Sequence, residues 1–121
     1  MAQNIVASTI FREAGIDGVK GMKAVASVIF NRGGGDAARY VSVVTKPHQF
    51  CCWDGKLFGD WYVHPCTDAR ALKITRDLFN GTFKPGGPWT MFFNPRIAVP
   101  VWNYQLKHKV RIGRQVYGDQ R

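Results

Sequence analysis

Glutamate is almost missing from this chain. Only 8 of its 121 residues are acidic, and Glu13 is the single glutamate among them. Glutamate is common on helix surfaces because it is a good helix former. Its near absence therefore singles out position 13 as a candidate functional position.

Long apolar runs are also missing. No stretch approaches the roughly 18 apolar residues that are needed to span a bilayer. The apolar segment 5–11 is interrupted by Ser8 and Thr9, and it lacks the basic residue and the cleavage site of a signal peptide. We therefore expect no stable membrane insertion, and synthesis in the cytoplasm without a signal peptide.

Cysteine is scarce, with only Cys51, Cys52 and Cys66. An odd number excludes a complete disulfide framework. The sequence leaves open a bridge from Cys66 to either of the other two, as well as free thiols. His48 and His64 lie nearby, but adjacent cysteines and a His-x-Cys spacing do not fit a structural zinc site. We expect no metal.

Positive charge is in excess. Lysine and arginine number 17, which gives a net charge of +9. Such a charge attracts polyanions: nucleic acid, an anionic membrane, or a cell envelope that carries phosphate and carboxylate. Basic residues alternate with aromatic ones over 102–114, as in nucleic-acid-binding modules. No standard nucleic-acid-binding motif accompanies them, so this class is the alternative and not the main prediction.

The order of the expected elements indicates an α+β fold. Apolar residues at helical spacing predict three to four helices, and short C-terminal strands follow where β-branched and aromatic residues gather. The length suits one domain over residues 1–121. The expected helices are 3–14, 17–32 with Asp17 as N-cap, 36–44 after Asp36, and 67–80 with Thr67 as N-cap; the expected extended segments are 89–93 and 109–117.

Glu13 stands at the end of the first expected helix, one residue before Ala14 and Gly15. The C-terminal end of a helix carries partial negative charge, which disfavours a carboxylate and raises its pKa. Burial beside Phe11 would raise it further. A raised carboxyl pKa suits a general acid near neutral pH, whereas an ordinary exposed glutamate paired with Arg12 is the alternative.

Several motifs follow one another in the order of a known family. The stretch 10–17 continues through Gly21, an Ala-Val-Ala run at 24–26, and Asn31-Arg32. It resembles the opening motif of the SleB-type cell wall hydrolases, roughly G-E-A-R-G-E followed by spaced G, A-V-A and N-R. Later matches are the Gln-Phe pair at 49–50, the Asn-Gly pair at 80–81, Phe-Phe-Asn-Pro at 92–95, and Ile-Gly-Arg-Gln-Val-Tyr at 112–117, which resembles the family's I-G-N-H-V-F.

This resemblance implies a lysozyme-like domain that cleaves the peptidoglycan glycan strand between N-acetylmuramic acid and N-acetylglucosamine, without a cofactor. The first motif glutamate, which is the catalytic acid in the family, falls on Glu13. The second motif glutamate falls on Asp17, and the closing histidine is replaced by Gln115.

Sugar sites need flat apolar faces and planar hydrogen-bonding groups. Besides Asp17, the residues that would bind substrate are Gln49, Phe50, Trp53, Phe92, Phe93, Asn94 and Trp102. Core packing is the alternative role for the aromatic side chains, and loop stabilisation is the alternative for the two amides. Of Phe92 and Phe93, adjacent in an expected strand, one should face inward and the other outward.

A single carboxyl group favours lytic transglycosylation, in which the same group acts first as an acid and then as a base. The resulting strands end in 1,6-anhydro-muramic acid. The alternative is a hydrolytic muramidase, which uses a second carboxylate. Asp17, Asp54 and Asp60 are the candidates for that partner, although Asp17 also suits the N-cap of the second helix.

The short chain looks like a phage endolysin. On this reading a monomer is made in the host cytoplasm, is released by a holin, and acts on the cell wall. An excised catalytic domain of a longer protein fits the same residues.

Overall fold

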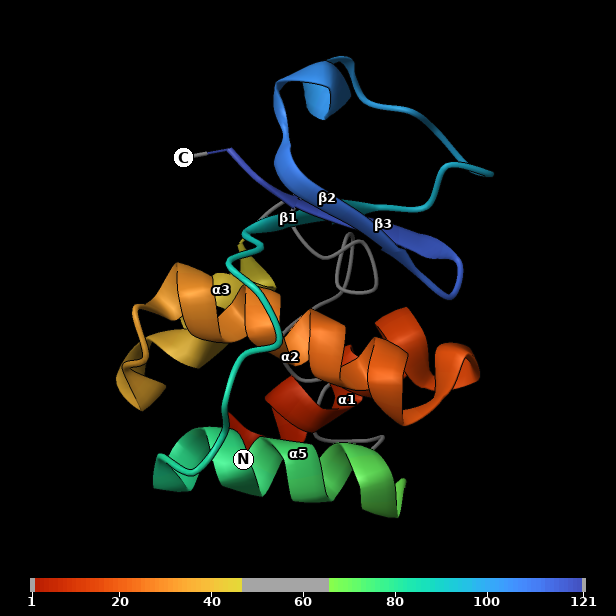
Figure 1. Cartoon of the computed structure of the whole chain (residues 1–121). Helices are drawn as coiled ribbons and strands as arrows, with labels where there is room; N and C mark the ends of the chain where they lie inside the picture. Colours follow the sequence, from red (N-terminus) through yellow and green to blue (C-terminus); the bar gives the residue numbers. More distant parts are fainter. Residues whose placement is uncertain (1, 47–65, 121) are drawn as a thin grey trace.

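The computed structural model describes residues 2–46 and 66–120 as an α+β fold, in which helices are followed by a small sheet (Figure 1). This confirms the predicted fold class and the predicted order of the elements. The helices are α1 (Ala2–Ala14), α2 (Gly18–Gly33), α3 (Tyr40–Thr45) and α5 (Ala69–Asn80); the strands are β1 (Met91–Phe93), β2 (Lys107–Ile112) and β3 (Gln115–Asp119).

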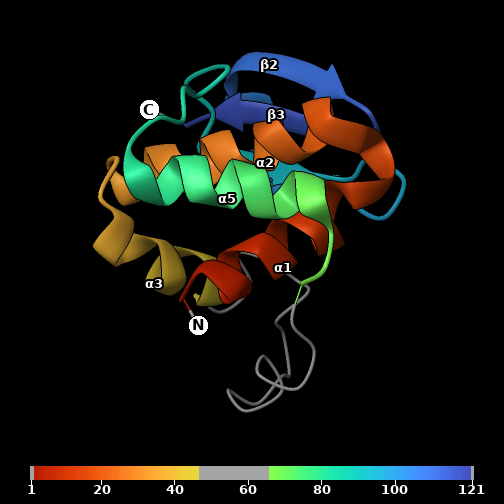
Figure 2. The same ribbon diagram turned by 90° about the horizontal axis from the view of Figure 1, so that it is seen from below.

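Helix α2 is the centre of the molecule. It packs against α1, α3 and α5 and also contacts β1 and β2. Every residue from Gly21 to Ile29 is buried except Lys23, as is typical of a helix enclosed on most sides. Figures 1 and 2 show the sheet on one side of α2 and α5 on the other.

The helix ends follow local capping chemistry. The Asp36 carboxylate accepts a hydrogen bond from the Ala38 amide, as its position before the third helix predicts. The predicted N-cap Thr67 is wrong by one residue. The N-cap of α5 is Asp68, whose carboxylate accepts hydrogen bonds from the amides of Arg70 and Ala71. Asp17 occupies the N-cap position of α2, but its side chain makes no capping hydrogen bond there.

The sheet is antiparallel, with the strands in the order β1-β3-β2. The extended segment expected over 109–117 is in fact two strands, since Gly113 (φ +61°) turns the chain between β2 and β3. The register shifts between Lys107 and Val110, where His108 adopts a left-handed conformation (φ 56°). The ends of β2 and β3 are therefore set by strand pairing, which the strand preferences of the residues did not reveal.

The Asn-Arg pair of the opening motif ties α2 to the sheet. Nδ2 of Asn31 donates to the carbonyl oxygens of Gly87 and Trp89, at 2.9 and 2.8 Å. Nε of Arg32 donates to the carbonyl of Thr90 at 2.6 Å. These bonds fix the segment that leads into β1, so the pair positions the sheet on the helices.

In the described part of the chain, no helix is both long and apolar enough to cross a membrane.

Candidate active site

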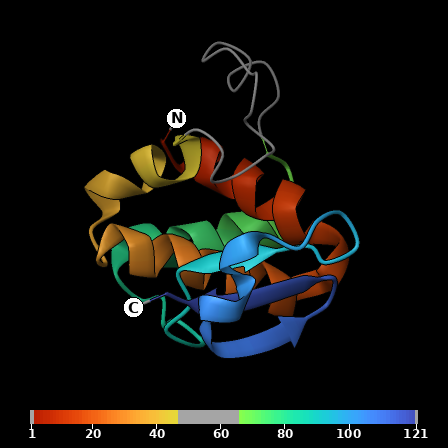
Figure 3. The ribbon, with the colours of Figure 1, turned by 90° about the horizontal axis from the view of Figure 1, so that it is seen from above.

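A cleft of about 470 Å³ opens where the end of α1 meets the sheet. Residues of the segment between β1 and β2 also line the cleft, and Figure 3, seen from above, shows this segment passing over the end of α1. The volume is in the range of ligand pockets. The described residues that line the cleft are Arg12, Glu13, Phe92, Phe93, Asn94, Ile97, Ala98, Pro100, Trp102, Arg114 and Gln115.

Glu13 is the one carboxylate among these described lining residues. It lies in the last turn of α1 and is only 7% exposed. Nε2 of the buried Gln115 donates to the backbone carbonyl of Glu13 at 3.1 Å. The residue that replaces the family's closing histidine thus joins β3 to the helix end that carries Glu13.

Aromatic rings form one wall of the cleft. Phe92 stacks on the buried ring of Tyr117, with centroids 5.6 Å apart and planes at 22°. Phe93 meets Trp102 edge-on at 5.7 Å. The two phenylalanines therefore follow the alternation that the strand predicts: Phe92 packs toward the core, and Phe93 joins Trp102 on the segment after β1.

Asn94 lines the same cleft and also shapes the chain that follows it. Its Oδ1 accepts the Arg96 amide at 3.0 Å, and its carbonyl accepts the amides of Ile97 and Ala98. The loop-stabilising role is thus present. The Nδ2 group has no hydrogen-bond partner among the described residues, and it can donate to a ligand.

Asp17 does not line the cleft. Its carboxylate lies behind the β2–β3 turn, where Oδ1 accepts both the backbone amide and the Nε group of Arg114 at 3.3 Å. The Asp17 side chain is 5% exposed and that of Arg114 is 44% exposed. Asp17 therefore stands one residue removed from the cleft and holds an arginine that lines it.

The buried hydroxyl of Tyr117 interacts electrostatically with the carboxylates of Asp17 and Glu13. Burial, followed by the negative charges of Asp17 and Glu13, raises the pKa of Tyr117 far above its ordinary value. The hydroxyl donates to the carbonyl of Gly21 at 3.4 Å. Tyr117 is consequently uncharged, and its ring packs beneath Phe92.

The structure brings five predicted site residues together: Glu13, Phe92, Phe93, Asn94 and Trp102. The predicted residues Gln49, Phe50 and Trp53, and the alternative carboxylates Asp54 and Asp60, lie outside the described residues. Sequence reasoning missed Arg12 and Arg114 as lining residues. Their signal was available, since each adjoins a motif position, Glu13 or Gln115.

Cys66 is a free thiol in the described part of the chain. Burial raises the pKa of the Cys66 thiol. The other cysteines and the histidines near them lie outside the described residues.

Comparison with known proteins assigns the family. Residues 16–118 match the family model described as Cell Wall Hydrolase. This chain belongs to the cell wall hydrolase family.

Two solved structures resemble this cell wall hydrolase over nearly its whole length. One is the catalytic domain of the germination-specific lytic transglycosylase SleB from Bacillus anthracis, at 27% identity and a TM-score of 0.73; the match covers 98% of this chain and 93% of that one. The catalytic domain of the Bacillus cereus SleB protein has the same fold, at 24% identity and a TM-score of 0.71, covering 98% and 89%. The search of curated proteins found no match.

The fold and the family together confirm a SleB-type cell wall hydrolase, and therefore an enzyme that acts on peptidoglycan.

Proposed function

We propose that this enzyme is a lytic transglycosylase that cleaves the bond between N-acetylmuramic acid and N-acetylglucosamine, with Glu13 as its acid and base. The observation that carries the proposal is the single carboxylate among the described lining residues, buried at the meeting point of α1 and the sheet. The Bacillus anthracis neighbour, itself titled a lytic transglycosylase, supports the same chemistry.

The mechanism needs only one carboxyl group. Desolvation favours the neutral acid form of a buried carboxyl, which can donate its proton to the glycosidic oxygen as the C1–O bond breaks. The sugar then carries oxocarbenium-like charge at C1. The Glu13 carboxylate next accepts the proton of the muramic 6-hydroxyl, whose oxygen bonds to C1 and closes the 1,6-anhydro ring. The carboxyl group is restored, and no water is consumed.

The other lining residues suit a glycan strand. Phe93 and Trp102 offer apolar surface against which sugar rings can pack, and Asn94 offers an amide donor. Arg12 and Arg114 bring positive charge to the same cleft. We include Asp17 as a residue that positions Arg114, in place of direct contact with substrate.

Digestion of purified peptidoglycan tests the proposal. Wild type should release muropeptides that are lighter by one water than those from a hydrolytic muramidase, as mass spectrometry can show. Glu13→Gln keeps the size of the side chain but removes the proton donor. We expect its rate to fall by about 10²-fold or more, in line with the usual contribution of a general acid.

The matched control is Asp36→Asn, which neutralises an exposed carboxylate and retains a good N-cap. Its digestion rate should equal that of wild type. Products of full hydrolytic mass would instead indicate a muramidase with an aspartate partner. Undiminished cleavage by Glu13→Gln would contradict the role of Glu13.

We further propose that residues 1–121 form one catalytic domain, which acts at the cell wall as a monomer. The endolysin role, synthesis in a host cytoplasm and release by a holin stay predictions.

A further inference from the structure

A second hollow lies outside the cleft, between α2, the segment before β1, and β2. It has a volume of about 240 Å³, and we call it the lysine groove. It shares no lining residue with the cleft. The described residues that form it are Lys20, Lys23, Ala24, Ser27, Lys84, Gly86, Trp89 and Ile112.

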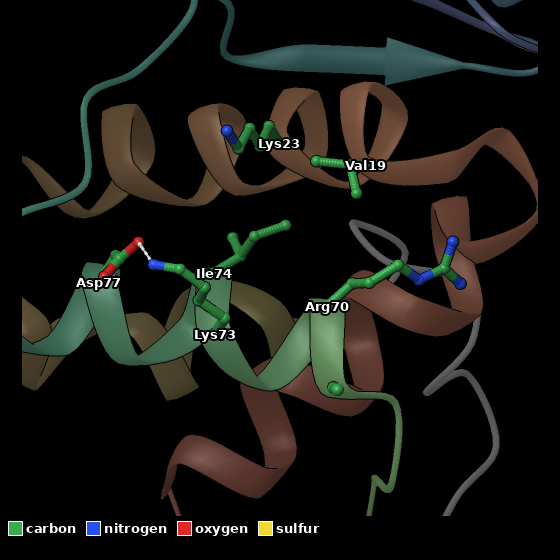
Figure 4. Close-up of a pocket in the computed structure, with 7 residues that line it drawn as sticks. Val19, Lys23, Arg70, Lys73, Ile74 and Asp77 are labelled. Carbon is green, nitrogen blue, oxygen red and sulfur yellow. Dashed lines mark hydrogen bonds and ion pairs between the residues drawn. The ribbon is translucent and has the colours of Figure 1, made fainter.

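The lysine groove continues into a larger hollow of about 400 Å³ between α2 and α5, and Lys23 lines both. Figure 4 shows Val19 and Ile74 between the two helices, with Lys23 on α2 above α5. The guanidinium end of Arg70 points away from Lys23 in the same view. Lys23 on α2 therefore stands where the two hollows adjoin.

Among the described residues, no carboxylate neutralises the positive charge of the lysine groove. In the adjoining hollow, Lys73 pairs with Asp77 at 3.3 Å and Arg70 pairs with Asp68 at 2.9 Å. By contrast, Lys20, Lys23 and Lys84 are exposed and have no carboxylate partner among the described residues. An anion bound in this hollow would be attracted by all three ammonium groups at once.

Trp89 and Ser27 in the lysine groove are held in place by contacts within the protein, and their polar groups already make hydrogen bonds. The Trp89 indole donates to the carbonyl of His108 at 3.2 Å, and its ring packs against Tyr117 at 5.7 Å. The Ser27 hydroxyl accepts the amide of Gly86 at 2.9 Å and donates to the carbonyl of Lys23. The free polar groups are ammonium groups, so the groove recognises charge and not a pattern of sugar hydroxyls.

We propose that the lysine groove is a docking surface for a phosphodiester-linked polyol polymer of the cell wall. Phosphodiesters carry closely spaced charges that persist at neutral pH, and lysine binds them as a compact point charge. The exposed part of the Trp89 ring can pack against the aliphatic backbone between phosphates. The proposal rests on the cell wall family and not on the chemistry proposed for Glu13.

Binding to poly(glycerol phosphate), which has no glycosidic bond in its backbone, tests the proposal. The variant Lys20→Gln/Lys23→Gln/Lys84→Gln should bind the polymer about ten-fold or more weakly than wild type at moderate salt. The slope of log affinity against log salt should fall by about two, because fewer counterions are released. The matched control Arg39→Gln/Lys46→Gln/Arg96→Gln removes the same charge from exposed sites that lie neither in the groove nor on β2, and should weaken binding less than about two-fold.

Peptidoglycan stripped of phosphate polymers separates this proposal from the proposed function. The groove variant should digest stripped material at the wild-type rate and should sediment less with unstripped material. Equal binding by groove and control variants would overturn the proposal, and so would equal sedimentation with stripped and unstripped walls. Tighter groove-dependent binding to a single-stranded DNA oligonucleotide than to poly(glycerol phosphate) would assign the surface to nucleic acid instead.

Discussion

Asp17 illustrates how a single residue supports the site without lining it. Its buried carboxylate holds Arg114 through the backbone amide and Nε, and Arg114 in turn lines the cleft beside Gln115. The same carboxylate adds to the field that keeps Tyr117 neutral. Asp17 therefore links the start of α2 to the β2–β3 turn.

Asp17→Ala should lower the free energy of unfolding by about 1 kcal/mol, because the Arg114 side of the pair is partly exposed and screened. Cleavage should continue with unchanged products. Soluble glycan oligomers should show a raised KM and a nearly unchanged kcat, since Arg114 loses its support. A loss as complete as that of Glu13→Gln would show that Asp17 takes part in the chemistry.

At the residue scale, the sequence predicted Glu13 and the aromatic and amide residues that line the cleft with it, but not the two arginines. Glu13 stood out because one glutamate at a helix end is unusual in both composition and position. Arg12 and Arg114 were missed because arginine is frequent in this basic chain. Their places beside motif positions were a signal, but only the fold shows that both side chains reach the cleft.

At the scale of elements, the β2–β3 turn tolerates the fewest residue types at one of its positions, Gly113. Gly113 has φ +61°, and an added Cβ would collide with the Asp17 side chain. Gly34, at the end of α2, has a similar φ of +64° but open space around it. A substitution at Gly34 therefore measures backbone strain alone, whereas one at Gly113 adds a steric clash with Asp17.

Gly34→Ala should lower the unfolding free energy by about 1 kcal/mol, which is the strain of a left-handed alanine. Gly113→Ala should cost about 1–3 kcal/mol more, because Asp17 must move. Thermal or chemical unfolding of the two variants measures the difference. Equal losses would mean that the turn shifts freely and that Asp17 does not constrain it.

Helices were easier to predict than strands for a physical reason. Apolar periodicity locates α1 and α2, and a glycine follows the last residue of each, Gly15 and Gly34; both signals lie within or next to the segment itself. The ends of β1 and β2 depend on pairing with β3, which lies in another segment of the chain and, for β1, more than 20 residues away. The error at Thr67 has a similar cause: Thr67 and Asp68 are both good N-cap residues, so residue preference alone does not distinguish them.

For the whole molecule, buried tyrosines predict how stability depends on pH. In the unfolded chain tyrosine ionises near pH 10. Burial, then Asp17 and Glu13, raise the pKa of Tyr117, and burial, then Asp36, raise the pKa of Tyr40. Because the folded pKa is the higher one, this stabilisation is complete below about pH 10 and is lost as the pH rises toward the folded pKa.

The unfolding free energy should therefore fall above about pH 10, by about 1.4 kcal/mol per pH unit for each such tyrosine. Tyr117→Phe should make this decline shallower, and Tyr40→Phe is the matched variant in the helical layer. Denaturant unfolding at a series of pH values measures the slopes. Identical slopes in wild type and both variants would contradict the assignment.

The two outer strands of the sheet have a consequence for how the protein behaves when it is crowded. β1 has only three residues, and β2 carries three basic side chains and an irregularity at His108. Short, charged or interrupted edges are poor templates for another copy of the same chain. The edges of the sheet that forms one wall of the cleft thus offer little for a second copy to pair with, and we expect the protein to resist fibrous self-association at high concentration.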